Sequence, residues 1–327
     1  MGVEIKNCPS TLKTGFDTYS PLALKKMFGG RKVSPILPYK SPASNAVTEE
    51  LFRDNQKRMS ISGVQEKFSV LLDKNKLRLI SEGEQGQYIL KPIPNVGKKS
   101  EQMPANEHLT MQIASQIFGI ETAYNALIFF EDDTPAYLTK RFDVKADNNK
   151  WAQEDFAALA KRTPQTHGSD FKYIGNYLEL FEVLKTYVPA YTIEAIKLFK
   201  LILFNYLISN GDAHFKNFSL IETPLGDFKL SPAYDLLNSR IHIEDRDFAL
   251  NDGLLPPNKA KGKVREQFYI LGDLAGLPKK QVDRIFTNLT ANQDTVLALV
   301  NASYLDDKTK REYVQAYQTR LKKLSVI

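Results

Sequence analysis

The chain has 327 residues, of which 43% are hydrophobic and 25% are charged, and its formal net charge is +6. This balance predicts a folded protein of one large or two medium domains and excludes a disordered or fibrous chain. The single cysteine, Cys8, excludes an internal disulfide and is typical of a reducing compartment. The basic residues are spread along the chain, so they are compatible with a solvated surface or with weak attraction to an acidic partner.

No segment has the pattern of a targeting or membrane-spanning sequence. Residues 1–10 lack the apolar core of a signal peptide. The longest apolar run, 198–208, is interrupted by Lys200 and Asn205 and is too short to span a bilayer. We therefore expect a cytoplasmic protein with no membrane partner.

The first half of the chain is expected to be rich in strands. Residues 1–58 contain many Pro, Lys and Ser residues and predict an irregular extension or connector. A helix is expected over 105–118, with Gly119 as its stop. Short runs separated by turn residues predict an antiparallel sheet with strands at 68–72, 77–80, 87–91, 126–130 and 136–142.

The second half is expected to be mostly helical. The dense apolar spacing through 191–209 predicts a buried helix, and helical segments return over 263–324. A hairpin of 218–221 with 228–230 is expected between them. Strands followed by helices predict an α+β fold of two lobes, which we divide into an extension and two lobes at 1–58, 59–147 and 148–327.

The strongest local signal is Asn210-Gly-Asp-Ala-His-Phe-Lys-Asn217, directly after the expected buried helix. Phosphoryl transfer needs a carboxylate that positions or deprotonates the attacking hydroxyl, and nearby oxygen ligands for Mg²⁺. Asp212 and Asn217 are five residues apart, which is the spacing of the Asp and Asn in the protein-kinase catalytic loop. Lys216, between them, can neutralise charge on the transferred phosphoryl group.

A second carboxylate, Asp235, follows the expected hairpin, which would bring it close to Asn217 as a second metal ligand. Taken alone, an Asn-Gly-Asp sequence is more often a turn, and a histidine such as His214 is more often a structural residue. The whole octapeptide followed by Tyr234-Asp235 is far more specific.

The strand-rich half carries a second, weaker signal. Lys91 ends a strand, as the phosphate-binding lysine of a kinase does, and Glu107 on the following helix can hold it by a salt bridge. The alternative is an ordinary surface lysine and a surface glutamate. Upstream, Ser60-Ile-Ser-Gly-Val-Gln-Glu-Lys67 offers backbone N–H groups to phosphates, although it is neither a GxGxxG loop nor a Walker A motif.

Together these segments resemble the HipA family of serine/threonine kinases, the toxins of type II toxin–antitoxin pairs. The resemblance covers the chain from about residue 58 to its end. The matching segments, in order, are Ser60–Lys67, Ile89–Lys91, Asn106-Glu107, Arg141–Asp143, Gln153–Phe156, Asp212–Ser219 and Leu230–Asp235.

The resemblance implies a bilobal protein-kinase-like fold that uses ATP and Mg²⁺, with a nucleotide-binding lobe over 59–147 and a catalytic lobe over 148–327. Asp212 is the implied catalytic base, and Asn217 and Asp235 are the implied metal ligands. The implied ATP-binding residues are Ser62, Gly63, Val64, Gln65, Glu66, Lys67, Lys91, Lys140, Arg141, Phe142, His214, Lys216 and Tyr234.

The resemblance also implies a regulation, a substrate and a partner. Family members phosphorylate a serine of their own phosphate loop, which is Ser60 here, with Ser62 as a second candidate. A phosphoserine at this place would repel the ATP phosphates and switch the enzyme off. The implied substrate is a translation component such as an aminoacyl-tRNA synthetase. The implied partner is a small helix-turn-helix antitoxin, through which alone the chain would meet DNA.

Two features depart from the family pattern. Lys140 stands where family members often have Glu, which leaves the adenine contact to the main chain. Only 59 residues precede Ser60, as in short members in which the N-terminal subdomain is absent or separately encoded. Two rival interpretations stay open: a nucleotide-binding pseudokinase, against which the intact set of site residues argues, and a small-molecule or lipid kinase.

Overall fold

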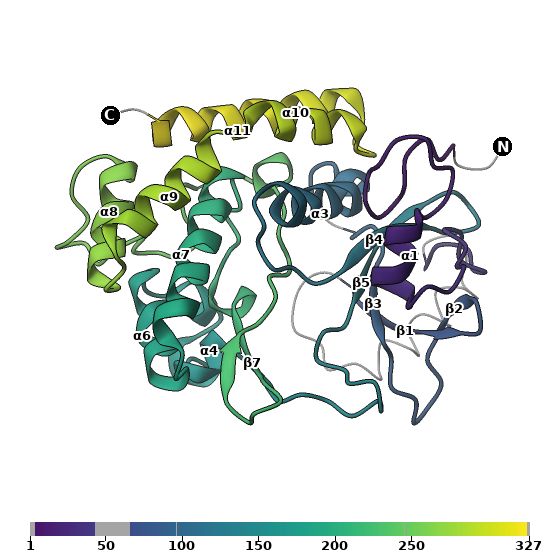
Figure 1. The fold of residues 1–327 in the computed structure, drawn as a ribbon, viewed down its shortest axis with the longest axis horizontal. Coiled ribbons are helices and arrows are strands. Elements are labelled where there is room, and N and C mark those ends of the chain that lie inside the picture. The colour runs from purple at the N-terminus through teal and green to yellow at the C-terminus, as the bar shows by residue number, and fades with distance from the viewer. Residues whose placement is uncertain (1–3, 43–65, 96, 245, 326–327) are drawn as a thin grey trace.

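The strand-rich half of the chain is a five-stranded antiparallel sheet with the order β2-β1-β3-β5-β4 (Figure 1). The computed structural model of the protein describes residues 4–42, 66–95, 97–244 and 246–325. Each expected strand is present within one or two residues of its expected bounds. The strands are β1 (Phe68–Asp73), β2 (Lys76–Leu79), β3 (Tyr88–Lys91), β4 (Asn125–Phe129) and β5 (Pro135–Lys140).

Both faces of this sheet are buried, because successive side chains of a strand point to opposite faces. On β4, Leu127 and Phe129 belong to the core that includes helix α3 (Met103–Gln112). Ala126 and Ile128 belong to a second core on the other face. The end of α3 continues as a π-helical turn, Ile113–Ile117, so the expected helix over 105–118 is present with an irregular last turn.

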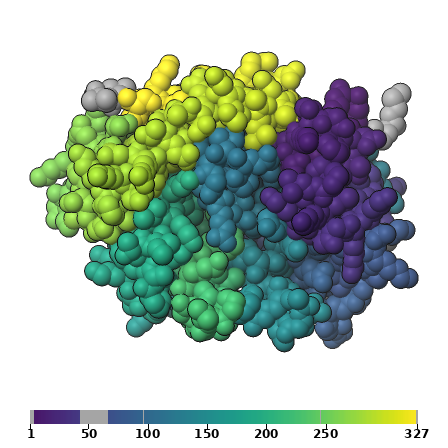
Figure 2. Space-filling model, viewed as in Figure 1, coloured from purple at the N-terminus to yellow at the C-terminus, as the bar shows by residue number. Residues whose placement is uncertain are grey.

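The N-terminal segment supplies the cover for the second face, which differs from the irregular connector that the sequence suggested. It contains a helix, α1 (Pro21–Phe28), with Ser20 as the N-cap and Gly29 in the left-handed conformation at its end. Cys8 and Met27 are fully buried against the sheet. Figure 2 shows this segment, in purple, lying over the strand-rich half.

The second half of the chain is mostly helical, as expected. Helix α7 (Tyr191–Leu207) lies at its centre and is buried on most sides. A three-stranded sheet, β6-β7-β8, holds the expected hairpin of β7 (Ser219–Glu222) and β8 (Phe228–Leu230), with β6 (Gln153–Asp155) added at its edge. The other helices are α4 (Phe156–Leu159), α5 (Pro164–His167), α6 (Leu178–Tyr187), α8 (Val264–Leu274), α9 (Lys279–Thr290), α10 (Gln293–Ala302) and α11 (Asp307–Ser325).

The last helix, α11, joins the two halves. It runs along one edge of the molecule over α3 and α7 (Figure 1). The Tyr313 hydroxyl lies 2.9 Å from Thr110 Oγ1 on α3. Among the described residues, no helix combines the length and apolar character that crossing a bilayer requires.

Candidate active site

A cleft of about 1150 Å³ lies where the two halves meet. Its walls come from strands β3 and β5 of the five-stranded sheet, from α3 and from the loops around β7 and β8. Of the residues singled out in the sequence, those lining it are Lys67, Lys91, Glu107, Lys140, Arg141, Phe142, Asp212, His214, Lys216, Asn217, Tyr234 and Asp235. The two candidate segments, far apart in sequence, therefore share one cavity.

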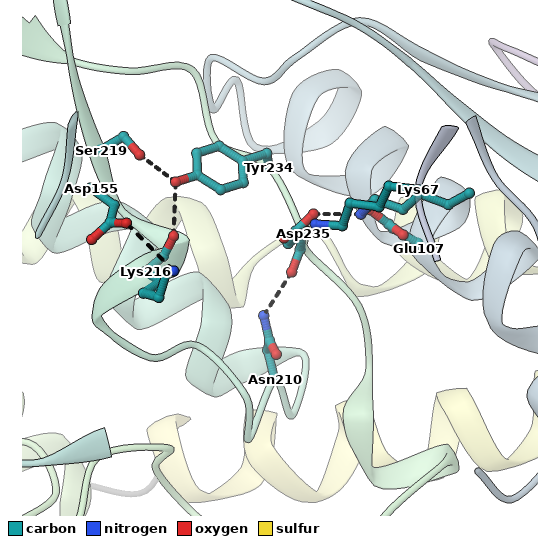
Figure 3. Close-up of polar contacts among 9 residues, drawn as sticks. Lys67, Glu107, Asp155, Asn210, Lys216, Ser219, Tyr234 and Asp235 are labelled. Carbon is teal, nitrogen blue, oxygen red and sulfur yellow. Dashed lines mark hydrogen bonds and ion pairs between the residues drawn. The ribbon is translucent and has the colours of Figure 1, made fainter. Parts of the chain in front are cut away.

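A buried group of three charged side chains lies at the centre of the cleft. Lys91 Nζ is 2.7 Å from Glu107 Oε1 and 2.5 Å from Asp235 Oδ1. The side chains of Lys91 and Glu107 are each only 4% exposed. The ion pair expected between strand β3 and helix α3 is thus present, and Asp235 joins it from the other half (Figure 3).

The protonation states of this group follow from burial and pairing. Burial alone would lower the pKa of Lys91, but the Asp235 and Glu107 carboxylates outweigh it and raise that pKa. Burial raises the pKa of Glu107, which Lys91 only partly offsets. At Asp235 burial is outweighed by Lys67 and Lys91, so its pKa is lowered. The lysine and Asp235 are therefore held charged.

The loop that carries Asp212 is fixed by hydrogen bonds to three parts of the chain. The Asn210 backbone N–H donates to Asn205 O of α7 at 2.9 Å. The Asn210 side-chain amide also donates to Asp235 O at 3.4 Å (Figure 3). The Gly211 N–H donates to Ser239 Oγ at 2.7 Å. The orientation of the loop is thus coupled to Asp235.

Asp212 has a partner that sequence reasoning missed. The Tyr173 hydroxyl donates to Asp212 Oδ1 at 2.7 Å. Tyr173 is half-buried and ends a short 3₁₀ turn, Phe171–Tyr173. A tyrosine in a turn has no distinctive spacing from the loop that carries Asp212, so the sequence held no signal for this contact.

Two polar atoms in the residues that follow Asp212 are buried without a hydrogen-bond partner among the described residues, Asn217 Oδ1 and His214 Nδ1. Burial lowers the pKa of His214 to about 4, so this imidazole is neutral at physiological pH. An orphaned amide oxygen in the same cleft as the Asp235 carboxylate fits a hard cation such as Mg²⁺, which binds few protein oxygens and completes its shell with phosphate and water. The described residues contain no cluster of three or more His, Cys, Asp or Glu side chains that could hold a metal ion by themselves.

Lys216 and Tyr234 are held by contacts within the helical half (Figure 3). Lys216 Nζ lies 3.9 Å from Asp155 Oδ2. The Tyr234 hydroxyl donates to Lys216 O at 3.0 Å and also hydrogen bonds with Ser219 Oγ. The Tyr234 ring faces the ring of Phe142, with centroids 6.0 Å apart. The aromatic pair spans the cleft between the two halves.

The backbone at 140–142 is partly engaged in the fold. The Lys140 N–H donates to Tyr124 O at 2.7 Å, and the Arg141 N–H donates to Gln87 O at 2.9 Å. No described residue accepts a hydrogen bond from the Phe142 N–H. We expect the backbone around 140–142 to meet adenine, and of its three N–H groups only that of Phe142 is available.

Part of the expected phosphate loop lies outside the described residues, namely Ser60, Ser62, Gly63, Val64 and Gln65. Glu66 and Lys67 are described. Lys67 Nζ lies 3.8 Å from Asp235 Oδ2 and is labelled beside it in Figure 3. The end of the loop therefore reaches the centre of the cleft.

A family model described as "HipA-like C-terminal domain" matches residues 59–297. A Haemophilus influenzae protein named "Putative kinase" is 27% identical over 226 residues, which are 67% of this chain and 63% of that protein. "Putative kinase Y4dM" of Sinorhizobium fredii is 32% identical over 212 residues, covering 60% of this chain and 49% of that protein. The chain thus spans about half to three fifths of the length of these relatives.

Two solved structures share the fold. The first, of the Shewanella oneidensis HipA, HipB and operator DNA complex, matches with a TM-score of 0.57 and 22% identity over 80% of this chain and 63% of that one. The second, of the Helicobacter pylori proinflammatory kinase CtkA, matches with a TM-score of 0.54 and 11% identity over 78% of this chain and 92% of that one. At these identities the likeness concerns the fold.

Proposed function

The chain belongs to the HipA-like C-terminal domain family, and from this membership we propose that it is an ATP-dependent protein kinase that phosphorylates serine or threonine. It would use Mg²⁺ and act in the cytoplasm. The nucleotide-binding lobe would comprise residues 59–147 and the catalytic lobe 148–327. The names of the relatives and the kinase fold of both structural neighbours support this proposal.

One observation carries the proposal. Lys91 is buried between Glu107 and Asp235 in the same cleft that contains Asp212 and Asn217. A lysine held by a helix glutamate, a metal-binding carboxylate, an acceptor-positioning carboxylate and an asparagine are the parts that phosphoryl transfer requires. A merely structural ion pair would not need an orphaned amide oxygen in the same cleft.

The residues of the chain would divide the reaction among them. Asp212 would accept the proton of the acceptor hydroxyl. The hydroxyl oxygen then attacks the γ-phosphorus of ATP, and the bond from this phosphorus to the oxygen that bridges the β- and γ-phosphates breaks, which releases ADP. Lys91, kept charged by Glu107, neutralises the phosphates. Asn217 and Asp235 would hold Mg²⁺, which neutralises charge on the phosphate oxygens.

The remaining cleft residues would position the nucleotide. The free Phe142 N–H would meet adenine, and the neutral His214 and the Tyr234 ring would line its pocket. Lys216 would reach the transferred phosphoryl group. Residues 62–67 would cover the phosphates, and Lys67 Nζ lies 3.8 Å from Oδ2 of Asp235, the carboxylate that would bind the metal.

We place the enzyme in a toxin–antitoxin pair. The structure from Shewanella oneidensis is titled as a toxin–antitoxin system with HipA, HipB and operator DNA. By analogy, the partner would be a helix-turn-helix antitoxin, with DNA contacted through it. The substrate would be a translation component such as an aminoacyl-tRNA synthetase. Phosphorylation of Ser60 or Ser62 by the enzyme itself would repel ATP and provide the off switch.

The test is incubation of the purified protein with Mg·ATP, followed by mass spectrometry of the intact chain and its peptides. We expect phosphate on Ser60 or Ser62, no reaction in EDTA, and no reaction of Asp235→Ala. Nucleotide titration of the phosphorylated chain should give weaker binding. ATP binding without transfer to any protein would indicate a pseudokinase, and transfer only to a lipid or small molecule would contradict the protein-kinase proposal.

A further inference from the structure

The strongest unexplained contact in the cleft is the hydrogen bond from Tyr173 to Asp212. We propose that Tyr173 is a positioning residue for phosphoryl transfer, which fixes the Asp212 carboxylate so that its second oxygen receives the acceptor hydroxyl. This inference rests on the proposed kinase function and adds a residue outside the motifs that define it.

The two oxygens of Asp212 have different surroundings. Oδ1 accepts from the Tyr173 hydroxyl at 2.7 Å. No described residue donates a hydrogen bond to Oδ2, and Asp212 faces the cleft. A carboxylate held through one oxygen presents the other in a fixed direction, which is the requirement for a base that must meet a proton at hydrogen-bond distance.

The Tyr173 hydroxyl carries its proton at neutral pH and is therefore a donor there. Burial raises the pKa of Tyr173 well above its ordinary value, and the hydrogen bond to Asp212 raises it further. The proton therefore stays on the tyrosine. Tyr173 can orient Asp212 without competing with it for the proton of the acceptor.

The backbone around Tyr173 is fixed, so the hydroxyl cannot easily move away. Tyr173 O accepts from the Asn251 N–H at 2.9 Å. Next to it, Ile174 O accepts from the Arg162 guanidinium, which also pairs with Glu179. Gly175 has φ +94°, a conformation in which any residue with a Cβ would be strained, and that Cβ would also press on the Glu179 carboxylate.

The ring of Tyr173 is held as well. It meets the ring of His214 edge to face, with centroids 5.1 Å apart. His214 belongs to the same loop as Asp212, so the tyrosine contacts that loop twice. This double contact favours a positioning role over that of an acceptor, because a phosphorylated Tyr173 would place about two negative charges against the Asp212 carboxylate.

The test compares Tyr173→Phe with Tyr191→Phe. Tyr191 is a half-buried tyrosine outside the cleft whose hydroxyl donates to Ala275 O at 2.8 Å, so its variant loses a similar hydrogen bond away from the site. Transfer from γ-labelled Mg·ATP is measured to the chain itself and to myelin basic protein as a generic acceptor. ATP binding is measured by calorimetry.

We expect Tyr173→Phe to lower kcat about tenfold or more and to leave the ATP affinity unchanged. A tenfold change corresponds to the free energy of one hydrogen bond to a charged group. Tyr191→Phe should keep the wild-type kcat. If the wild type is active and Tyr173→Phe has the same kcat or a higher one, the inference about Tyr173 is overturned, while the kinase proposal stands. A wild type that binds ATP but transfers nothing would reject the kinase proposal and, with it, the reaction that Tyr173 serves.

Discussion

At the scale of single residues, the cleft depends on a lysine that is almost completely buried. Lys91 has two carboxylate partners, of which Glu107 is equally buried. A buried ion pair contributes little net stability compared with apolar residues of the same size, but removing one partner leaves an uncompensated charge in the interior. The pair is therefore best explained by function, and its loss should be measurable as instability.

We predict that Lys91→Met destabilises the protein by about 3 kcal/mol, because Glu107 loses its partner while it stays buried. Urea denaturation followed by circular dichroism measures this change. Lys229→Met is the control, since Lys229 pairs with Glu121 at 3.5 Å with both side chains exposed; it should change the stability by less than about 1 kcal/mol. Equal stability of the two variants would argue against an ionised buried pair.

The candidate residues of the cleft could be identified from the sequence because each of them lies in a short segment with a recognisable pattern. Asp212 and Asn217 are separated by five residues on one loop, and Lys91 ends a strand that alternation identifies. The structure brings them into one cleft with Glu107 and Asp235. Tyr173 was missed because it reaches Asp212 only through the packing of an irregular segment, which leaves no periodic signal.

At the scale of elements, helix α11 connects helix α3, which carries Glu107, to the loop that carries Asp212. Tyr313 contacts Thr110 on α3. Arg320 is 2% exposed, donates to Ser209 Oγ at 3.2 Å at the start of the loop and also pairs with Asp247. Ser209 has a φ of +58°, a strained conformation that needs such support.

We predict that Arg320→Ala destabilises the protein by roughly 2–4 kcal/mol and also lowers kcat, since it removes a buried side chain and a contact of the loop that carries Asp212. Lys323→Ala is the matched control, because Lys323 pairs with the same Asp247 at 3.2 Å but is 47% exposed. Thermal unfolding and transfer assays on both variants check this. A loss of stability in the Arg320 variant with an unchanged kcat would confine the helix to a structural role.

The elements that the sequence did not predict are those that depend on distant partners. Strand β6 has only three residues, all polar, and exists because Gln153–Asp155 pairs with β7. Helix α1 has a clear N-cap and stop, but its eight residues lie in a segment rich in turn formers. Its stability comes from packing on the far face of the sheet, which periodicity alone does not reveal.

At the scale of the whole molecule, a buried histidine ties the N-terminal segment to the site. His108 follows Glu107 on α3 and is fully buried. Its Nε2 hydrogen bonds with Ser10 O at 2.9 Å, and because a carbonyl can only accept, Nε2 carries the proton. Nδ1 has no partner among the described residues, so protonation would bury an unpaired charge. Burial accordingly lowers the pKa of His108 to about 4.

We predict that the protein loses stability as the pH falls from about 6.5 toward 4. In this range the unfolded chain binds protons at His108 and at His214 and the folded chain does not, so the unfolded state is favoured, by about 3 kcal/mol for each histidine with a shift of this size. His108→Gln keeps a donor toward Ser10 O and should reduce the dependence by about half. His167→Gln, at an exposed position, should not. Identical pH profiles for wild type and His108→Gln would contradict this account.

The arrangement of the whole chain could be predicted in outline. Strands before helices correctly indicated an α+β fold with two halves, because each half has its own period of apolar residues. The burial of the N-terminal segment against the sheet could not be predicted, since it is set by tertiary contacts such as that of Ser10 with His108. These contacts join residues about a hundred positions apart.

The most direct test of the central claim separates nucleotide binding from phosphoryl transfer in Asp212→Asn. This substitution keeps the shape of the side chain but replaces the charged carboxylate, which can accept a proton, with a neutral amide, which cannot act as a base. With γ-labelled Mg·ATP and calorimetric titration on the same preparations, we predict ATP affinity within about threefold of wild type and a loss of transfer of at least about a hundredfold. Transfer by Asp212→Asn at the wild-type rate would contradict the assignment of this cleft as a kinase active site.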